Sequence, residues 1–458
     1  MKKSVSLTKK SLSLKESIII GSMLFGMFFG AGNLIFPVHM GQLAGSNVWP
    51  AIIGFIVTGV GLPLLGVASL GISKKNSLFE LSSLVGDNYK YFFTILLYLT
   101  IGPFFAIPRC ATTSFTIGIA PLLGGASEVV PRFIFTLIFF SIVLFLAINP
   151  NKIMTFIGQY INPIFLLFLS VLIIVSFFNP IKQINPILPQ GDYASMPFFK
   201  GFLEGYNTMD AIASLAFGIT VITVIRNLGI KNENAIAFNI IKAGLIGCGL
   251  MAIIYILTTL MGTMSIGMYE VSQNGGQALA QISKHYFGNF GIYLLLATVS
   301  LACLKTALAL VVSCSEMFNK MFPNILSIKK WSIVFTVFSF IVSNFGLNAI
   351  INYSIPALMF LYPLTITIIL LSLFGKLFNY DKTIFLSTTI FTFNAAIFDF
   401  VAAFPRGNIL SDQLINSVTA FGQKFLPFSN LGLGWLVPAI VGFEIGLILK
   451  SIHNKKLQ

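Results

Sequence analysis

Residues 26–45 read GMFFGAGNLIFPVHMGQLAG, an apolar segment long enough to cross a lipid bilayer. Gly30, Gly32 and Asn33 in its middle, followed by Pro37, disfavour one continuous helix. Unwinding a helix inside hydrocarbon leaves backbone N–H and C=O groups without partners, which is costly unless protein, water or a ligand satisfies them. The segment therefore predicts a broken membrane helix whose freed backbone groups can bind an anionic head group or a small cation.

The composition is that of a polytopic membrane protein. The chain of 458 residues is 56% hydrophobic and 9% charged, with a mean hydropathy of +0.91. Its first twenty residues resemble the start of a signal peptide, but the apolar run continues to membrane-spanning length without a small-residue cleavage site, which predicts a retained first span. Cysteines 110, 248, 303 and 314 form no CxxC pair, and we expect buried thiols rather than a disulfide or a metal cluster.

Hydrophobic runs predict an all-α fold with about twelve membrane-spanning helices and brief loops. The predicted spans are residues 16–40, 48–72, 91–123, 133–149, 153–178, 200–226, 235–266, 286–316, 331–345, 347–374, 383–404 and 432–450. The third span is interrupted at Pro103 and Pro108. Residues 1–15 and 451–458 are predicted to be short tails.

The basic residues are distributed unequally between the two sides of this topology. With the N-terminus inside, twenty of the 28 Lys and Arg residues fall on the cytoplasmic side, six fall outside, and Arg109 and Lys305 lie within spans. Such a bias predicts that both termini are cytoplasmic in a multi-pass protein of the cell membrane. The same bias explains the net charge of +14 without nucleic-acid binding, because the basic residues form no patch.

Two five-helix units are predicted, residues 16–178 and 200–374, with two additional helices in residues 383–450. A second candidate for a broken helix, GFLEGYNTMDAIASLAFG at residues 201–218, opens the second unit as the first break opens the first. Because each unit has an odd number of helices, the units form an inverted repeat that brings both breaks to one depth. This prediction depends on topology and break position, since the two halves show no visible sequence identity.

Four motifs then indicate a family. GAGNLIFP (30–37), GPFFAIPR (102–109), GFLEGYNTMDAIASLAFG and LACL (301–304) resemble the bacterial branched-chain amino acid:cation symporters, and the resemblance covers nearly the whole chain. It implies the leucine-transporter-like inverted-repeat fold. It also implies import of leucine, isoleucine and valine driven by sodium, with no cofactor beyond the coupling ion.

A zwitterionic amino acid needs donors for its carboxylate, acceptors for its ammonium group and an apolar pocket for its side chain. Backbone N–H groups at the glycine break, beside the positive end of the following half-helix, suit the carboxylate. Carbonyls freed in span 6 suit the ammonium group. Phe28 and Ile212 are candidates for the apolar wall, although most of the 47 phenylalanines must pack or face lipid. The predicted substrate-binding set is Phe29, Gly30, Ala31, Gly32, Thr208, Asp210, Ala211, Ser214 and Phe217.

Two polar residues in the broken spans each have two interpretations. Asn33 forms an interhelical hydrogen bond worth about 1 kcal/mol, or, by resemblance to the superfamily, lends its side-chain oxygen to a sodium ion beside the substrate carboxylate. Asp210 lies near the bilayer centre, where a carboxylate is costly and usually functional. It holds the ammonium group, belongs to an ion path or forms a structural salt bridge.

Lys305 departs from the family pattern, which has a threonine at this position of LACLKTALAL (301–310). By resemblance, the ion site comprises Gly26, Phe29, Asn33, Ala302 and Thr306. An ammonium group cannot bind sodium, but it can donate to the carbonyls that sodium would contact. Lys305 therefore either replaces one sodium ion, leaving proton-coupled or weakly coupled transport, or it snorkels or pairs with Asp210.

Arg109 and Glu204 are predicted vestibule or gate residues. Arg109 lines the outer vestibule or contacts the substrate carboxylate, and a structural bridge between Arg109 and Glu204 is the alternative. GGQALAQI (275–282) lies between spans 7 and 8 and is predicted to be a short outer lid helix or a loop helix without a gating role.

Other classes of protein fit less well. A membrane enzyme needs catalytic groups clustered at one depth, but His39, His285 and His453 are scattered, and HExxH, GxSxG and phosphate-loop motifs are absent from the sequence. We therefore expect no enzymatic activity and no transition-metal site. A channel or an amino acid-sensing membrane receptor remains the alternative, because broken helices also line selectivity filters. The sequence sets neither the oligomeric state nor the preferred aliphatic amino acid.

Overall fold

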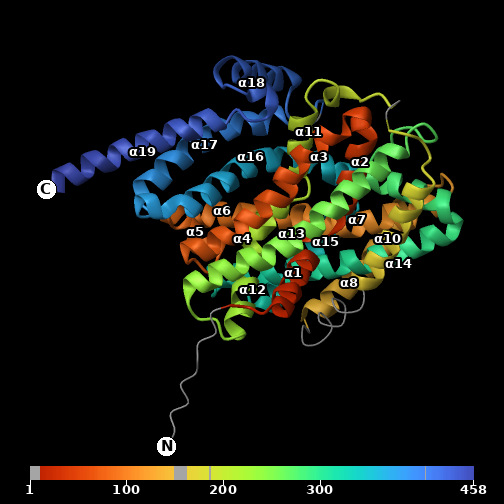
Figure 1. Cartoon of the computed structure of the whole chain (residues 1–458), viewed down its shortest axis with the longest axis horizontal. Coiled ribbons are helices and arrows are strands. Elements are labelled where there is room, and N and C mark those ends of the chain that lie inside the picture. Colours follow the sequence, from red (N-terminus) through yellow and green to blue (C-terminus); the bar gives the residue numbers. More distant parts are fainter. Residues whose placement is uncertain (1–10, 149–161, 185–186, 408, 458) are drawn as a thin grey trace, which may run out of the picture.

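The computed structural model describes residues 11–148, 162–184, 187–407 and 409–457. In these ranges the chain forms helices and no β-strand, and nine helical segments are long and apolar enough to cross a membrane. Figure 1 shows the long helices lying side by side in one bundle. The predicted all-α polytopic fold is confirmed. The count of twelve spans stays a prediction, and residues 153–161 of the predicted fifth span lie outside the described residues.

The helices follow the predicted spans closely. The first half contains α1 (Leu14–Phe28), α2 (Ala31–Ala44), α3 (Val48–Ile56), α4 (Leu62–Ser73), α5 (Leu78–Ser82), α6 (Asp87–Leu99), α7 (Ala106–Gly118), α8 (Val129–Ile148) and α10 (Asn162–Phe178). The second half contains α11 (Pro197–Tyr206), α12 (Asp210–Asn227), α13 (Glu233–Met264), α14 (Gly275–Met321), α15 (Ile328–Ser343), α16 (Leu347–Phe374), α17 (Lys382–Ala402), α18 (Asp412–Phe425) and α19 (Leu436–Leu457).

The first predicted break separates α1 from α2. The chain leaves the helical conformation at Phe29 and Gly30, which have extended backbone angles, and becomes helical again at Ala31. The side chain of Asn33 accepts a hydrogen bond of 2.9 Å from the Gly30 N–H group. This bond satisfies one of the amide groups that the start of α2 leaves free. Pro37 lies inside α2 without ending it.

The second predicted break separates α11 from α12. Asn207 to Met209 connect the two half-helices, and Met209 has a left-handed backbone conformation with φ of 65°. This conformation is uncommon for a residue with a side chain. The Thr208 hydroxyl accepts a bond of 3.3 Å from the Asp210 N–H group, which caps α12. Both broken helices are therefore present where the sequence predicted them.

One local prediction needs correction. The third span unwinds at Gly102, within the π-helical turn Thr100–Phe104, and resumes at Ala106. Pro103 belongs to this interruption, but Pro108 lies in the first turn of α7, where a proline removes no needed hydrogen bond.

Residues 275–282 are helical, as predicted. Non-helical backbone angles at Gly288 (φ 58°, ψ −148°) divide this short first segment of α14 from the long remainder. A short helix is therefore present between spans 7 and 8, and its role as a lid stays a prediction.

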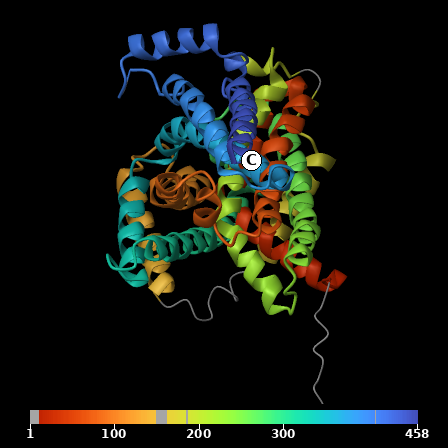
Figure 2. The same ribbon diagram turned by 90° about the vertical axis from the view of Figure 1, so that its left-hand side faces the viewer.

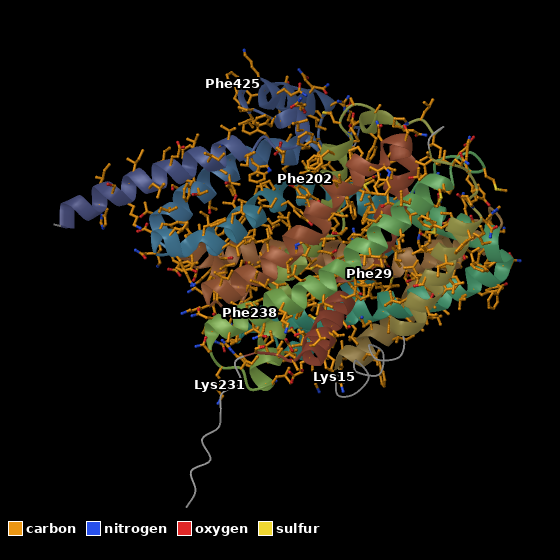
Figure 3. All side chains as sticks on the ribbon, in the orientation of Figure 1. Lys15, Phe29, Phe202, Lys231, Phe238 and Phe425 are labelled. Atoms are coloured by element: carbon orange, nitrogen blue, oxygen red, sulfur yellow. The ribbon has the colours of Figure 1, made fainter. Side chains whose placement is uncertain are left out.

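The helices that carry the two breaks occupy the interior of the bundle. Helix α2 packs against α13, α7 packs against α14, and α12 packs against α4. In the view of Figure 3, Phe29, at the first break, lies near the middle of the molecule, whereas Lys15 and Lys231 lie at its lower edge. In Figure 2, α18 runs across the top of the bundle. The breaks are therefore surrounded by protein, as unwound backbone in a membrane requires.

Candidate substrate and ion site

A small cavity lies where both breaks meet α7 and α14. Its volume is 30 Å³, which is room for about two water molecules. Six of the predicted substrate-binding residues line the cavity: Gly30, Ala31, Gly32, Thr208, Asp210 and Phe217. Asn33, Thr306 and Arg109 line it as well. The structure thus brings residues from four distant parts of the sequence to one polar chamber.

Three predicted substrate residues lie outside this lining. Phe29 packs against Phe25, with ring centroids 4.9 Å apart, and points toward Tyr255 of α13. Ser214 donates to the Ala211 carbonyl over 2.6 Å and faces Gly66 of α4. Ala211 is fully buried in the first turn of α12. The sequence places these residues near the breaks, but none of the three lines the cavity.

Asn33 connects the two broken helices. Its Nδ2 group donates a hydrogen bond of 2.5 Å to Asp210 Oδ2 and another hydrogen bond to the Tyr255 hydroxyl. Its Oδ1 atom accepts from Gly30 as described above. The interhelical hydrogen bond predicted for Asn33 is therefore present, whereas its role at a sodium ion stays a prediction.

Asp210 is a buried carboxylate with well-placed donors. Its side chain is 3% exposed. The Tyr255 hydroxyl donates 3.1 Å to Oδ2, the same oxygen that Asn33 contacts. Buried charges persist only when hydrogen bonds or opposite charges compensate them. Tyr255 was missed by sequence reasoning, although a tyrosine hydroxyl in an otherwise apolar stretch of the seventh span was a usable signal.

Arg109 lies against the end of α11. Its Nη1 donates 2.7 Å to the Asn207 carbonyl and its Nη2 donates 3.4 Å to the Thr208 carbonyl. These are carbonyls that the end of a helix leaves without partners, and a cation there interacts favourably with the helix dipole. The Nε group of Arg109 is buried and has no hydrogen-bond partner. The predicted bridge to Glu204 is wrong, since Arg109 forms no ion pair among the described residues.

The close approach of Arg109 to Gly32 explains why position 32 has no side chain. A Cβ atom on Gly32 would lie 2.7 Å from Arg109 Nη2, so a side chain there would displace the guanidinium group. Gly30 meets Thr306 of α14 in the same way, with a Cβ atom 3.0 Å from the threonine methyl group. Both glycines let neighbouring helices approach the break closely.

A second, larger cavity of 470 Å³ lies beside the first. Phe36 and Asn207 belong to its lining, together with Glu204, His39 and Lys200. The Arg109 guanidinium lies 5.1 Å from the centre of the Phe36 ring, so the Phe36–Arg109 pair stands between the two cavities. Glu204 therefore lies in the larger cavity and Arg109 in the smaller one.

Lys305 is buried next to the predicted ion site. It is 9% exposed, and the adjacent Thr306 faces Gly30 at the first break. Thr306 donates 3.2 Å to the Ala302 carbonyl. The Lys305–Asp210 pair considered from sequence is not formed, because Lys305 has no ion pair within the described ranges. Gly26 and Ala302 are buried nearby but outside the small cavity.

The arrangement of helices and cavity defines a class of protein, a polytopic membrane protein of transporter fold with a polar chamber at two helix breaks. The fold resembles that of solved transporters. It matches the nucleobase-cation-symport-1 family transporter MHP1, crystallised with bromovinylhydantoin, at a TM-score of 0.62, 14% identity and coverage of 96% of this chain and 93% of the other. It also matches a manganese transporter of Eremococcus coleocola at a TM-score of 0.58, 13% identity and coverage of 96% and 97%.

The chain belongs to the branched-chain amino acid transport protein family, whose model matches residues 13–453. It is 46% identical to the branched-chain amino acid permease BrnQ of Lactobacillus delbrueckii subsp. lactis, over 98% of this chain and 99% of the relative. It is 40% identical to BrnQ of Bacillus subtilis, with coverage of 97% and 99%. The resemblance read from the four motifs is confirmed. The prediction that the protein is not an enzyme is also confirmed, because these relatives are permeases.

Proposed function

We propose that this protein imports leucine, isoleucine and valine by cation-coupled alternating access. The observation that carries the proposal is that Arg109 and Asp210 both line one cavity, because a positive and a negative group at a helix break complement an amino acid zwitterion. The names of the relatives support branched-chain amino acids as the cargo.

The carboxylate of the substrate binds at the start of α2. The backbone N–H groups of Gly30, Ala31 and Gly32 lie at the positive end of this half-helix. The unpartnered Nε group of Arg109 supplies a further donor in the same cavity. Binding of the carboxylate gives this N–H group a hydrogen-bond partner. Such binding is favourable because an unsatisfied buried polar group is costly.

The ammonium group binds on the side of Asp210 and the freed carbonyls of Asn207 and Thr208. Arg109 contacts these carbonyls in the present conformation, so the substrate ammonium group competes with the guanidinium for them. The aliphatic side chain faces the apolar part of the lining. This part consists of Met27, Phe28, Ile101, Ala213, Phe217 and Leu310.

The two cavities support alternating access. The small cavity is too small for an amino acid, and the larger one is of the size that holds small ligands, about 300–1,000 Å³. Substrate enters the larger cavity, and movement of Phe36 and Arg109 admits it to the chamber. Inverted five-helix units and cytoplasmic termini suit this cycle, and the excess of basic residues on the side of both termini supports that orientation.

Coupling depends on Lys305 and Thr306. We propose that the Lys305 ammonium group occupies the position at which a threonine of the family pattern would help to bind one sodium ion. Transport is then coupled to protons or only weakly coupled. The burial of Lys305 without an acidic partner in the part of the chain that the structure describes supports this assignment. Asn33 and Thr306 remain available for a second sodium ion beside the substrate carboxylate, since hard cations prefer oxygen ligands.

Counterflow of labelled leucine in proteoliposomes tests the function. Vesicles loaded with unlabelled leucine are expected to accumulate the label transiently and saturably, and isoleucine and valine are expected to compete. Lysine and glutamate are the controls, because neither side chain suits the apolar wall. Non-saturable flux without counterflow would identify a channel and contradict the proposal.

A further inference from the structure

A buried carboxyl group that the transport site does not use lies on α17. Asp399 is 5% exposed, and its Oδ2 atom is buried without a hydrogen-bond partner. Among the described residues it forms no ion pair. An ionised carboxylate in such surroundings costs several kcal/mol, whereas the neutral acid costs far less.

The group opposite Asp399 belongs to the broken helix. Tyr206, the last residue of α11, lies close enough for its hydroxyl to interact electrostatically with the Asp399 carboxyl. The Tyr206 hydroxyl is also buried and has no hydrogen-bond partner. The ring of Tyr206 stacks on Tyr362 of α16, with centroids 3.9 Å apart and 12° between the planes. Tyr362 belongs to α16, which packs along α17 and also contacts α11, so α16 connects the segments that carry these two unpartnered polar groups.

The helix segment around Asp399 packs through aromatic side chains. Phe398 stacks on Phe421 of α18, and Phe400 lies 5.9 Å from Phe360 of α16. A hard metal cation requires several oxygen ligands. The Asp399 side chain has no hydrogen-bond partner among the described residues, which favours a proton over such a cation.

The other charged groups on neighbouring elements face elsewhere. Lys424 of α18 lies over the Phe425 ring at 5.3 Å. Glu444 of α19 is exposed and lies near the opposite end of α17, where Ser387 donates to the Gly442 carbonyl. Glu204 of α11 lines the larger cavity together with Lys200. Of the carboxyl groups on these elements, Asp399 is the one that interacts electrostatically with the Tyr206 hydroxyl.

We propose that Asp399 and Tyr206 form a proton-binding site behind the break between α11 and α12, and that Asp399 holds a proton in this conformation. The proton comes from bulk water and binds to Oδ2, and no other bond changes. Tyr206 immediately precedes Asn207, whose carbonyl Arg109 holds. Movement of α11 during transport therefore changes the surroundings of Asp399, which makes proton binding sensitive to the transport cycle. This last step relies on the proposed function, whereas the existence of the site does not.

Infrared difference spectroscopy of the purified full chain tests the site directly. At neutral pH the wild type is expected to show the carbonyl stretch of a protonated carboxyl group, shifted in heavy water, and Asp399→Asn is expected to lose that band. Asp381→Asn is the matched control, since Asp381 caps the other end of the same helix and asparagine preserves the cap. The control is expected to keep the band. Equal bands in the wild type and Asp399→Asn would overturn the proposal.

Melting temperature as a function of pH shows whether Asp399→Asn still folds, and the effect of sodium chloride on the infrared band identifies the bound ion. The Asp399→Asn variant is expected to match the wild type in melting temperature near pH 5 and to exceed it near about pH 8, because only the wild type must keep its carboxyl protonated against the rising pH. Tyr206→Phe is expected to shift the band while the ring stack persists. Removal of the band by sodium chloride at constant pH would show a sodium site and overturn the proton assignment. Leucine binding by Asp399→Asn within about twofold of wild type would separate this site from the transport site.

Discussion

Asn33 at the start of α2 and Asp210 at the start of α12 are joined by a hydrogen bond of 2.5 Å between Nδ2 and Oδ2. The two residues are 177 positions apart in the sequence. Each opens the half-helix that follows a break, so the bond fixes the two breaks against each other at the binding chamber. Tyr255 donates to the same carboxylate oxygen and ties both to α13.

Asp210→Asn removes the negative charge of the chamber and retains the size of the side chain. We expect leucine affinity to fall about 10- to 100-fold, because a hydrogen bond to a charged group is worth about 1.5–3 kcal/mol. Calorimetry with leucine measures the change. Asp192→Asn is the control, since Asp192 pairs with Lys200 on an exposed surface. Unchanged affinity in Asp210→Asn would remove this carboxylate from the substrate site.

Arg109→Lys keeps the charge but loses the guanidinium fork that reaches two carbonyls. Lysine is a compact point charge and cannot reproduce this geometry. We expect about tenfold weaker leucine binding and a lower melting temperature. The corresponding change at Arg226, which pairs with Glu233 on the surface, is expected to alter neither. Equal effects of the two substitutions would indicate a general loss of stability instead.

Lys305→Thr restores the hydroxyl of the family pattern. Leucine uptake by the wild type is expected to continue when potassium replaces sodium, whereas the variant is expected to require sodium, because an oxygen ligand replaces the ammonium group. Uptake under imposed sodium and proton gradients measures this. Lys284→Thr, at an exposed position of the same helix, is the matched control. Strict sodium dependence of the wild type would contradict the replacement of sodium by Lys305.

Gly32→Ala places a methyl group 2.7 Å from Arg109 Nη2. The guanidinium must move and lose its bond to the Asn207 carbonyl, so we expect at least about tenfold slower leucine counterflow. Gly249→Ala in α13 is the control, since a Cβ atom there meets nothing within 4 Å, and alanine favours helix. Full counterflow activity in Gly32→Ala would show that the close approach is dispensable.

Glu80 of α5 and Lys320 near the end of α14 form an ion pair with an N–O distance of 3.1 Å. Burial opposes ionisation of Glu80, but hydrogen bonds from the Asn76 backbone and from Lys320 outweigh it and hold the pKa of Glu80 below its usual value. A carboxylate of lowered pKa stabilises the fold above its ordinary pKa, and this contribution is lost as the pH falls through the folded value.

Both partners of this pair are partly exposed, so Glu80→Gln is expected to cost less than about 1 kcal/mol at neutral pH. Thermal unfolding as a function of pH and salt measures the cost. The difference from wild type is expected to vanish below about pH 4 and to shrink in high salt. A difference that persists under both conditions would show that Glu80 acts through packing instead of charge.

The sequence was sufficient to predict both helix breaks and the residues nearest to them. Two closely spaced glycines, Gly30 and Gly32, and a carboxylate, Asp210, are unusual in membrane-spanning segments. These single positions were therefore enough to indicate the breaks. The orientation of each side chain was harder to predict. Ser214 lies one helical turn beyond Asp210 and on the same face of α12. It nevertheless lies against Gly66 of α4 and outside the cavity, because α4 packs against α12.

Long-range contacts account for the other differences. Tyr255 joins the site only because α13 crosses α2, and Arg109 pairs with helix-end carbonyls instead of Glu204 because α7 meets the second break itself. The electrostatic interaction between Asp399 and Tyr206 also joins residues that are far apart in the sequence. Spacing along one chain contains no information about these crossings, which depend on the packing of the whole bundle.

Binding of leucine and its two single-group analogues to the purified protein tests the central claim most directly. The claim is that two broken helices hold an amino acid by both of its charged groups. Calorimetry is expected to show leucine binding at least about tenfold more tightly than isoamylamine, which lacks the carboxylate, and than isocaproate, which lacks the ammonium group. An analogue that binds as tightly as leucine would contradict the account.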